Sequence, residues 1–129
     1  EITMANRTIQ TNYAPPALGA YSQGVQAGST LYISGQLGLD PKSGLLLPTF
    51  IGQADPSFRN IKFILEEAGF TLNDVVKFTV FMTDLAEFDA LNSLMSGLFV
   101  SNCYPARSAV QVSCLPKGGL IEVDAIASR

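Results

Sequence analysis

The chain has 129 residues, a net charge of −3 and no histidine, and these totals exclude several kinds of site. Without histidine there is no Ser-His-Asp or Cys-His triad and no usual general base, and most zinc sites are removed. Proton transfer must then rest on carboxylates, Lys, Tyr, Cys or water. The acidic balance, with no run of Lys or Arg, argues against a dedicated duplex-binding protein, which needs a basic patch.

The length suits one domain, residues 1–129, with a real core. Charged residues are 15% of the chain, below the roughly 25% of soluble domains, which favours burial of apolar surface against other subunits. No apolar run approaches the roughly 20 residues that span a bilayer, and the N-terminus lacks a secretory h-region. We expect a cytoplasmic or mitochondrial-matrix protein. Residues 1–6 are expected to be flexible, and Met4 is a candidate natural start that would make residues 1–3 foreign.

Strand patterns come first along the chain. Arg7–Gln10 is a short strand candidate, and Gly24–Ala27 and Thr30–Ser34 are predicted strands joined by a tight turn at Gly28-Ser29. Two loops flank these strands. Residues 13–19 contain two prolines, and residues 35–52 form a loop long enough to indicate a functional or packed segment.

Two helices are predicted on either side of the strand Val75–Met82. The first runs from Ile51 or Asp55 to Ala68, with a core-facing apolar stripe, Asp55 as cap and Gly69 as stop. The second runs from Leu85 to about Ser101, after a cap at residues 83–84.

The last two predicted strands, Arg107–Cys114 and Leu120–Ala127, flank a turn with proline and glycines and indicate a hairpin. Each contains a charge, Arg107 or Glu122, and burying a charge is costly unless it is paired or used. If Gln111 pairs with Glu122, both charged residues share one face, with Arg107 roughly 13 Å along the strand from Gln111. The alternatives are an ion pair for Arg107 and a solvent-exposed edge position for Glu122.

These elements predict an α+β fold, a mixed β-sheet with two helices packed on one face. A homo-oligomer would cover the other face. Cys103 and Cys114 have neither zinc nor redox spacing, so both are expected to be buried free thiols. The acidic residues Asp84, Glu87 and Asp89 lie near a helix start, where capping explains them better than a metal site does.

Several motifs occur in a fixed order along the chain. They are Gly19-Ala20-Tyr21-Ser22-Gln23, Tyr32-Ile33-Ser34-Gly35-Gln36, Pro105-Ala106-Arg107-Ser108, Leu115-Pro116-Lys117 and Ile121-Glu122-Val123-Asp124-Ala125-Ile126-Ala127. Together they resemble the RidA (YjgF) family of reactive-intermediate deaminases, from about Thr8 to Ala127. The resemblance implies a chorismate-mutase-like fold of the bacillus type and a homotrimer whose sheets face a central barrel, with active sites between subunits. It also implies hydrolysis of 2-imino or enamine acids, such as 2-iminobutanoate and 2-iminopropanoate, to 2-keto acids and ammonia, without metal or cofactor.

The resemblance also assigns site residues by position. Arg107 corresponds to the carboxylate-binding arginine, and Glu122 and Tyr21 to cleft residues with catalytic roles. Ser34 and Gly35 match the segment that lines the cleft, and Asn92 matches an asparagine of the neighbouring wall. The chain departs from many members by having Ala20 instead of proline, and Ala109 where many bacterial members have cysteine; this small side chain leaves room for a ligand.

The chemistry of these residues fits imine hydrolysis. The guanidinium of Arg107 matches a carboxylate bidentately, and Glu122 is suited to orient water as a general base. Tyr21 is either a hydrogen-bond donor that closes the cleft or an ordinary half-buried aromatic. Two other functions stay open. One is a module that binds 2-keto acids without turnover, and the other is RNA cleavage or translational inhibition, which the acidic balance and the lack of a basic or aromatic stripe oppose.

Overall fold

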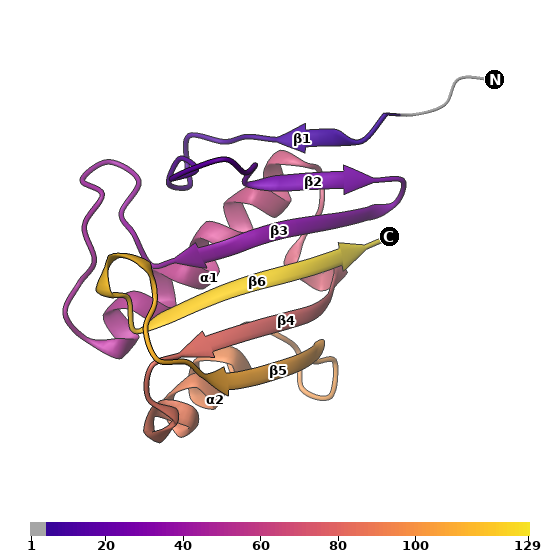
Figure 1. Cartoon of the computed structure of the whole chain (residues 1–129). Helices are drawn as coiled ribbons and strands as arrows, with labels where there is room; N and C mark the ends of the chain where they lie inside the picture. Colours follow the sequence, from indigo (N-terminus) through magenta and orange to yellow (C-terminus); the bar gives the residue numbers. More distant parts are fainter. Residues whose placement is uncertain (1–4) are drawn as a thin grey trace.

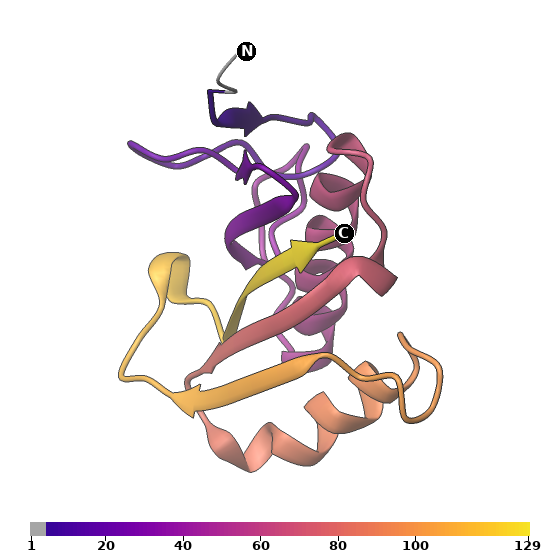
Figure 2. The same cartoon turned by 90° about the vertical axis from the view of Figure 1, so that its right-hand side faces the viewer.

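The computed structural model describes residues 5–129 as a layer of sheet with helices on one side (Figures 1 and 2). The strands are β1 (Arg7–Ile9), β2 (Gly24–Ala27), β3 (Thr30–Leu37), β4 (Val75–Met82), β5 (Ala106–Gln111) and β6 (Ile121–Ser128). The helices are α1 (Phe50–Glu67) and α2 (Phe88–Ser96), with 3-10 turns η1 (Leu72–Asp74), η2 (Leu85–Glu87) and η3 (Pro116–Gly118). Most of the segment expected to be flexible, residues 1–4, lies outside the described residues.

The strands form a mixed sheet in the order β1-β2-β3-β6-β4-β5. Strands β4 and β5 run parallel, and the other neighbouring strands run antiparallel. The tight turn between β2 and β3 is confirmed, because Ala27 lies opposite Thr30 and Gly28 has a φ of 61°. This mixed sheet with two helices confirms the predicted α+β class.

The predicted hairpin between the last two strands is wrong. Strand β4 lies between β5 and β6, so that Val80 is in register with Ala109 on one side and Val123 on the other. The connection over residues 112–120 crosses the end of β4, where Val112 N–H donates to Met82 O and Thr83 N–H donates to Leu120 O. The residues between β5 and β6 do form a turn, but this turn joins two strands that are separated by β4.

The inserted strand changes which side chains share a face. Arg107 is in register with the fully buried Phe78, on the face that the helices cover. Glu122 is in register with Phe81, which belongs to the opposite, open face. Because side chains alternate along a strand, Arg107 and Glu122 project from opposite faces. The shared face predicted for these two residues is therefore wrong.

The core lies between the sheet and α1. The predicted stripe is confirmed by Phe58, Ile61, Ile64 and Leu65, which are all at most 2% exposed. The helix starts at Phe50 and not at residue 51 or 55, because the side chain of Thr49, instead of Asp55, accepts the N–H of Gly52. The stop at Gly69 is confirmed by its φ of 82°.

The second helix is shorter than predicted. Asp84 caps the short turn η2 by accepting the N–H of Ala86, and α2 then runs only from Phe88 to Ser96. Gly97 is its C-cap, and Asn102 has a φ of 67°, so the chain leaves the helix before the predicted end near Ser101.

The open face of the sheet carries exposed apolar side chains. Tyr32 is 51% exposed and Val110 is 42% exposed. The helices lie on one side of the sheet (Figure 2), and the burial alternation along β3 and β5 places both side chains on the other side. Such a face usually packs against another surface. Among the described residues, none of the helices has both the length and the apolar character that crossing a membrane requires.

The cysteines are not buried as expected. Cys103 and Cys114 are both exposed free thiols. Cys103 follows the early end of α2, and Cys114 lies beyond the end of β5 in the connection to β6, so neither reaches the core.

Candidate active site

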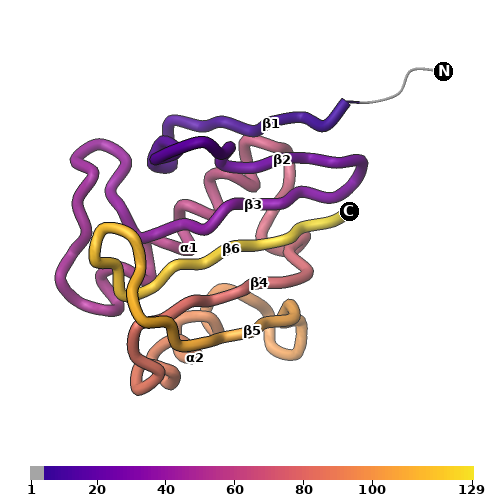
Figure 3. The backbone as a smooth tube through the Cα atoms, viewed as in Figure 1, coloured from indigo at the N-terminus to yellow at the C-terminus, as the bar shows by residue number. Residues whose placement is uncertain are grey.

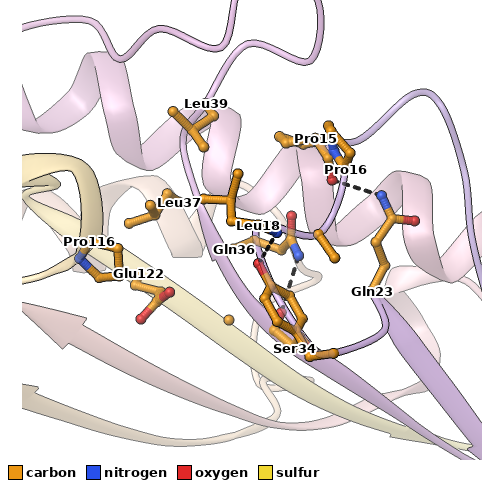
Figure 4. A pocket seen from close by; sticks show the side chains of 13 residues that line it. Pro15, Pro16, Leu18, Gln23, Ser34, Gln36, Leu37, Leu39, Pro116 and Glu122 are labelled. Atoms are coloured by element: carbon orange, nitrogen blue, oxygen red, sulfur yellow. Dashed lines mark hydrogen bonds between the residues drawn. The ribbon is translucent and has the colours of Figure 1, made fainter.

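A cavity of about 360 Å³ lies where β3 ends and β6 begins (Figure 4). The loop between β1 and β2 and the loops that follow β3 and precede β6 border it, and Figure 3 shows the course of the backbone there. It contains four of the predicted site residues, Tyr21, Ser34, Gly35 and Glu122. The remaining lining residues are Pro15, Pro16, Ala17, Leu18, Gln23, Gln36, Leu37, Leu39 and Pro116. The structure therefore gathers most of the predicted cleft in one place.

Glu122 lies against the backbone of Gly35. A Cβ on Gly35 would be 2.8 Å from Cδ of Glu122. Any residue other than glycine at this position would therefore displace the carboxylate. Gly35 belongs to a bulge in β3, where the register with β6 shifts between Ile33 and Gln36. Burial of the carboxyl and, as a second cause, the negative charge of Asp124 raise the pKa of Glu122 above its usual value. A carboxylate with a raised pKa is a stronger base, which suits proton transfer near neutral pH.

The hydroxyl of Tyr21 has a defined role in the cavity wall. It accepts the main-chain N–H of Leu18 at 2.9 Å, and the N–H of Tyr21 donates to Gly19 O in the same tight turn. Because the oxygen is the acceptor in this bond, the phenolic hydrogen stays available for another acceptor. Tyr21 is 47% exposed and lines the cavity, so it is not part of the hydrophobic core.

Ser34 and Gln23 hold the cavity walls together. The hydroxyl of Ser34 donates to Ser22 O at 2.6 Å, so its hydrogen is committed within the protein. Gln23 is buried; its Oε1 accepts the N–H of Thr11, and its Nε2 donates to several carbonyls, including that of Pro15 at 2.8 Å (Figure 4). Gln23 thereby fixes the proline loop that carries the wall beside Tyr21. Its importance was not predicted, because a glutamine in a polar motif resembles a surface residue.

Arg107 lies in a different cavity, of about 430 Å³, lined by Asn92, Met95, Ser96, Tyr104, Pro105 and Arg107. Its Nη1 donates to Oδ1 of Asn92 at 2.7 Å and contacts Sδ of Met95 at 3.5 Å. Its guanidinium carbon lies 5.1 Å from the centre of the Phe88 ring. These partners are neutral, and they leave the Nε–Nη2 edge, with two parallel N–H groups, for a carboxylate.

Phe88 contacts one of the candidate site residues, and the sequence did not indicate this contact. A phenylalanine at the start of an amphipathic helix is typical of a core residue, but this ring is 38% exposed and lies over the guanidinium of Arg107. Asn92, predicted to contact substrate, is the hydrogen-bond partner of Arg107. Ala109 lines neither cavity of the single chain and packs against the core. Within the described part of the chain, metal-binding side chains do not cluster in groups of three.

Comparisons with known proteins agree with this fold and these motifs. The family model described as Endoribonuclease L-PSP matches residues 11–129. A 2-iminobutanoate/2-iminopropanoate deaminase of Capra hircus is 46% identical over 126 residues, which are 97% of this chain and 91% of that protein. The deaminase of the same name in Salmonella typhimurium is 44% identical, over 96% of this chain and 98% of that protein.

Solved structures of similar proteins have the same fold. The crystal structure of RidA from an Antarctic Psychrobacter bacterium has 52% identity and a TM-score of 0.92, covering 95% of this chain and 99% of that one. The structure of E. coli TdcF with bound serine has 39% identity and a TM-score of 0.88, covering 95% and 98%. On the family model, the identities and the shared fold, this chain belongs to the RidA family, whose model is described as Endoribonuclease L-PSP.

Proposed function

We propose that this protein hydrolyses reactive 2-imino acids and their enamine tautomers, such as 2-iminobutanoate and 2-iminopropanoate, to 2-keto acids and ammonia. It would thereby protect the cell from damage by these intermediates. Relatives 43–46% identical over nearly the whole chain are named as deaminases of these two acids. The observation that carries the proposal is Glu122, a carboxylate with a raised pKa that is held against Gly35 in a cavity also lined by Tyr21.

The reaction needs only a positioned water and a group that moves protons. Glu122 takes a proton from water as the water oxygen bonds to the protonated imine carbon, which gives a carbinolamine. Glu122 then returns this proton to the nitrogen, the C–N bond breaks and ammonia leaves. Glu122 accepts the hydroxyl proton as the C=O bond of the 2-keto acid forms, and passes it to the departing ammonia or to solvent. The free hydrogen of Tyr21 donates to the developing oxygen or to the substrate carboxylate.

The carboxylate anchor comes from another copy of the chain in this proposal. Arg107 and Glu122 occupy separate cavities and opposite faces of the sheet, so one chain does not bring them onto one small substrate. A homotrimer of the chorismate-mutase-like kind, with the open sheet faces packed around a central barrel, would cover Tyr32 and Val110 and form the sites between subunits. Arg107, on the edge strand β5, would then reach the cavity of its neighbour.

Mixed assemblies test this arrangement. Arg107→Ala and Glu122→Gln subunits, each inactive alone, are unfolded together, refolded and assayed. With sites between subunits, a mixed trimer contains one site with both native residues, and random mixing restores about a quarter of all sites. No restoration, or a monomer in sedimentation, would contradict the trimeric site.

The activity itself is tested by measuring the clearance of 2-iminobutanoate. The wild type is compared with Glu122→Gln and with Glu67→Gln, a surface control that removes the same charge. We expect wild type and Glu67→Gln to be equal, and Glu122→Gln to lose roughly 10²- to 10⁴-fold in kcat, as for removal of a general base. Binding of 2-ketobutyrate without any clearance by wild type would make the protein a binding module. RNA cleavage, which the family description names, is not supported by the cavity around Glu122, because this anionic residue is the one charged residue that lines it.

A further inference from the structure

We infer that the cavity around Glu122 selects 2-imino acids with long apolar side chains over the shortest ones and over those with acidic side chains. This inference rests on the proposed function and concerns the part of the cavity that the hydrolysis itself does not use. The walls that contact the substrate side chain determine which imino acids are preferred.

The cavity has a small polar part and a larger apolar part. Pro15, Pro16, Ala17, Leu18, Leu37, Leu39 and Pro116 are apolar, and they are seven of its thirteen lining residues. Most of the polar lining is already engaged within the protein, since Ser34 donates to Ser22 O and the amide of Gln23 to loop carbonyls. The carboxylate of Glu122 and the hydrogen of Tyr21 remain for the reacting end. An apolar wall beside a few free polar groups is the usual design of a small-molecule pocket.

The apolar wall is held rigidly. Leu37 and Leu39 are each 5% exposed, and the buried amide of Asn60 donates to both of their carbonyls, at 3.1 and 3.2 Å. Between them, Gly38 lies so close to α1 that a Cβ would collide with the carbonyl of Gln53. The proline loop on the other side is fixed by Gln23. A preformed apolar wall binds a side chain without first having to be ordered.

Charge favours the same class. Glu122 is the one charged residue among the thirteen that line the cavity, and it is an anion. An imino acid with a second carboxylate on its side chain would place that group beside apolar walls and near Glu122. The neighbour's Arg107 that the proposed trimer brings here would already be paired with the carboxylate next to the imine. Burial of an unpaired charge is strongly unfavourable, so acidic side chains should be rejected.

A homologous series of substrates measures the effect. 2-Iminopropanoate, 2-iminobutanoate, 2-iminopentanoate and 2-iminohexanoate are generated in place by an amino-acid oxidase, and kcat/KM for their clearance is corrected for spontaneous decay. Burial of each added methylene predicts a rise of about fourfold per step. 2-Iminopentanedioate, with an acidic side chain, should fall below 2-iminobutanoate. Values that stay flat or fall beyond 2-iminobutanoate overturn the inference and leave the proposed function intact, whereas absence of clearance for every imine overturns the proposed function.

Two leucine variants test whether the apolar wall of the cavity is responsible for the preference for long side chains. Leu18 lines the cavity and is 50% exposed, and the N–H that it donates to Tyr21 does not depend on its side chain, so Leu18→Ser should fold. The ratio of kcat/KM for 2-iminohexanoate to that for 2-iminopropanoate should fall severalfold. Leu45→Ser changes a leucine that is 69% exposed and outside the cavity lining, and it should keep the wild-type ratio. An unchanged ratio in Leu18→Ser, or equal losses in both variants, overturns the assignment of the side-chain wall.

Discussion

Gly35→Ala should disable the reaction without unfolding the protein. The added methyl would lie 2.8 Å from Cδ, 3.0 Å from Oε2 and 3.1 Å from Cγ of Glu122. These are atoms at the end of a flexible side chain, so the carboxylate can move while the backbone stays. Gly35 is not among the residues with positive φ, so alanine fits its backbone without strain.

The expected magnitude follows from these distances. Carbon atoms in ordinary contact are about 3.5–4.0 Å apart, so the carboxylate must move by roughly 1 Å. Misplacement of a catalytic group by about 1 Å can lower the rate by roughly 10²-fold. The free energy of unfolding should change little, because alanine gains about 0.5–1 kcal/mol over glycine in a strand and an off-rotamer glutamate loses about 0.5–1.5 kcal/mol.

A double-mutant cycle is the assay. The kcat for 2-iminobutanoate is measured for wild type, Gly35→Ala, Glu122→Gln and the double variant, and urea unfolding is measured for each. Since the methyl acts through the carboxylate, the double variant should be no slower than Glu122→Gln alone. Gly97→Ala, whose methyl would make an ordinary 3.5 Å contact with Leu94 O, is the control with full activity. Full activity of Gly35→Ala, or additive losses in the double variant, would refute the reasoning.

Four further predictions concern groups in and around the two cavities. Asp124→Asn removes a charge that raises the pKa of Glu122, so the acidic limb of the kcat/KM profile should move to lower pH. Because the pKa of Glu122 is raised in the folded state, the fold loses stability as the pH rises through that pKa and the carboxyl ionises. Glu122→Gln, which stays neutral, should therefore raise the urea midpoint at pH 7 and not at pH 3. Phe88→Leu should raise KM about two- to fivefold by removing the ring over Arg107, with kcat nearly unchanged and Phe88→Tyr restoring KM. Asn60→Asp replaces a donor to two carbonyls by an acceptor, which should lower the free energy of unfolding by roughly 3 kcal/mol or more in urea titrations.

Local sequence patterns predicted the elements well and their pairing poorly. The apolar spacing of α1 and the turn at Gly28 are set by residues close in the chain, and both were confirmed. The partner of β6 is a long-range choice, and its apolar alternation fits β4 as well as β5. A wrong partner moves side chains to the wrong face, which is why Arg107 and Glu122 were first expected on the same side.

The site shows a similar division. The motif residues Tyr21, Ser34, Gly35 and Glu122 were predicted together and line one cavity. The amides that hold its walls, Gln23 and Asn60, were missed because their burial follows from the fold and not from their own type. Asn60 also retains a buried Oδ1 without a partner in the described residues, so its place is set by the two carbonyls that it serves.

The separation of Arg107 from Glu122 within one chain has a chemical consequence. An arginine beside Glu122 would lower the pKa of the carboxyl and occupy the guanidinium edge that a substrate needs. The chain instead gives Arg107 the neutral partners Asn92 and Phe88, and gives Glu122 a neighbouring anion, Asp124. Both groups therefore stay uncompensated: the arginine keeps a free edge for a carboxylate, and the glutamate stays basic enough to take a proton from water. In the proposed trimer, the carboxylate of the substrate would pair with the free edge of Arg107, and its imine end would lie at Glu122.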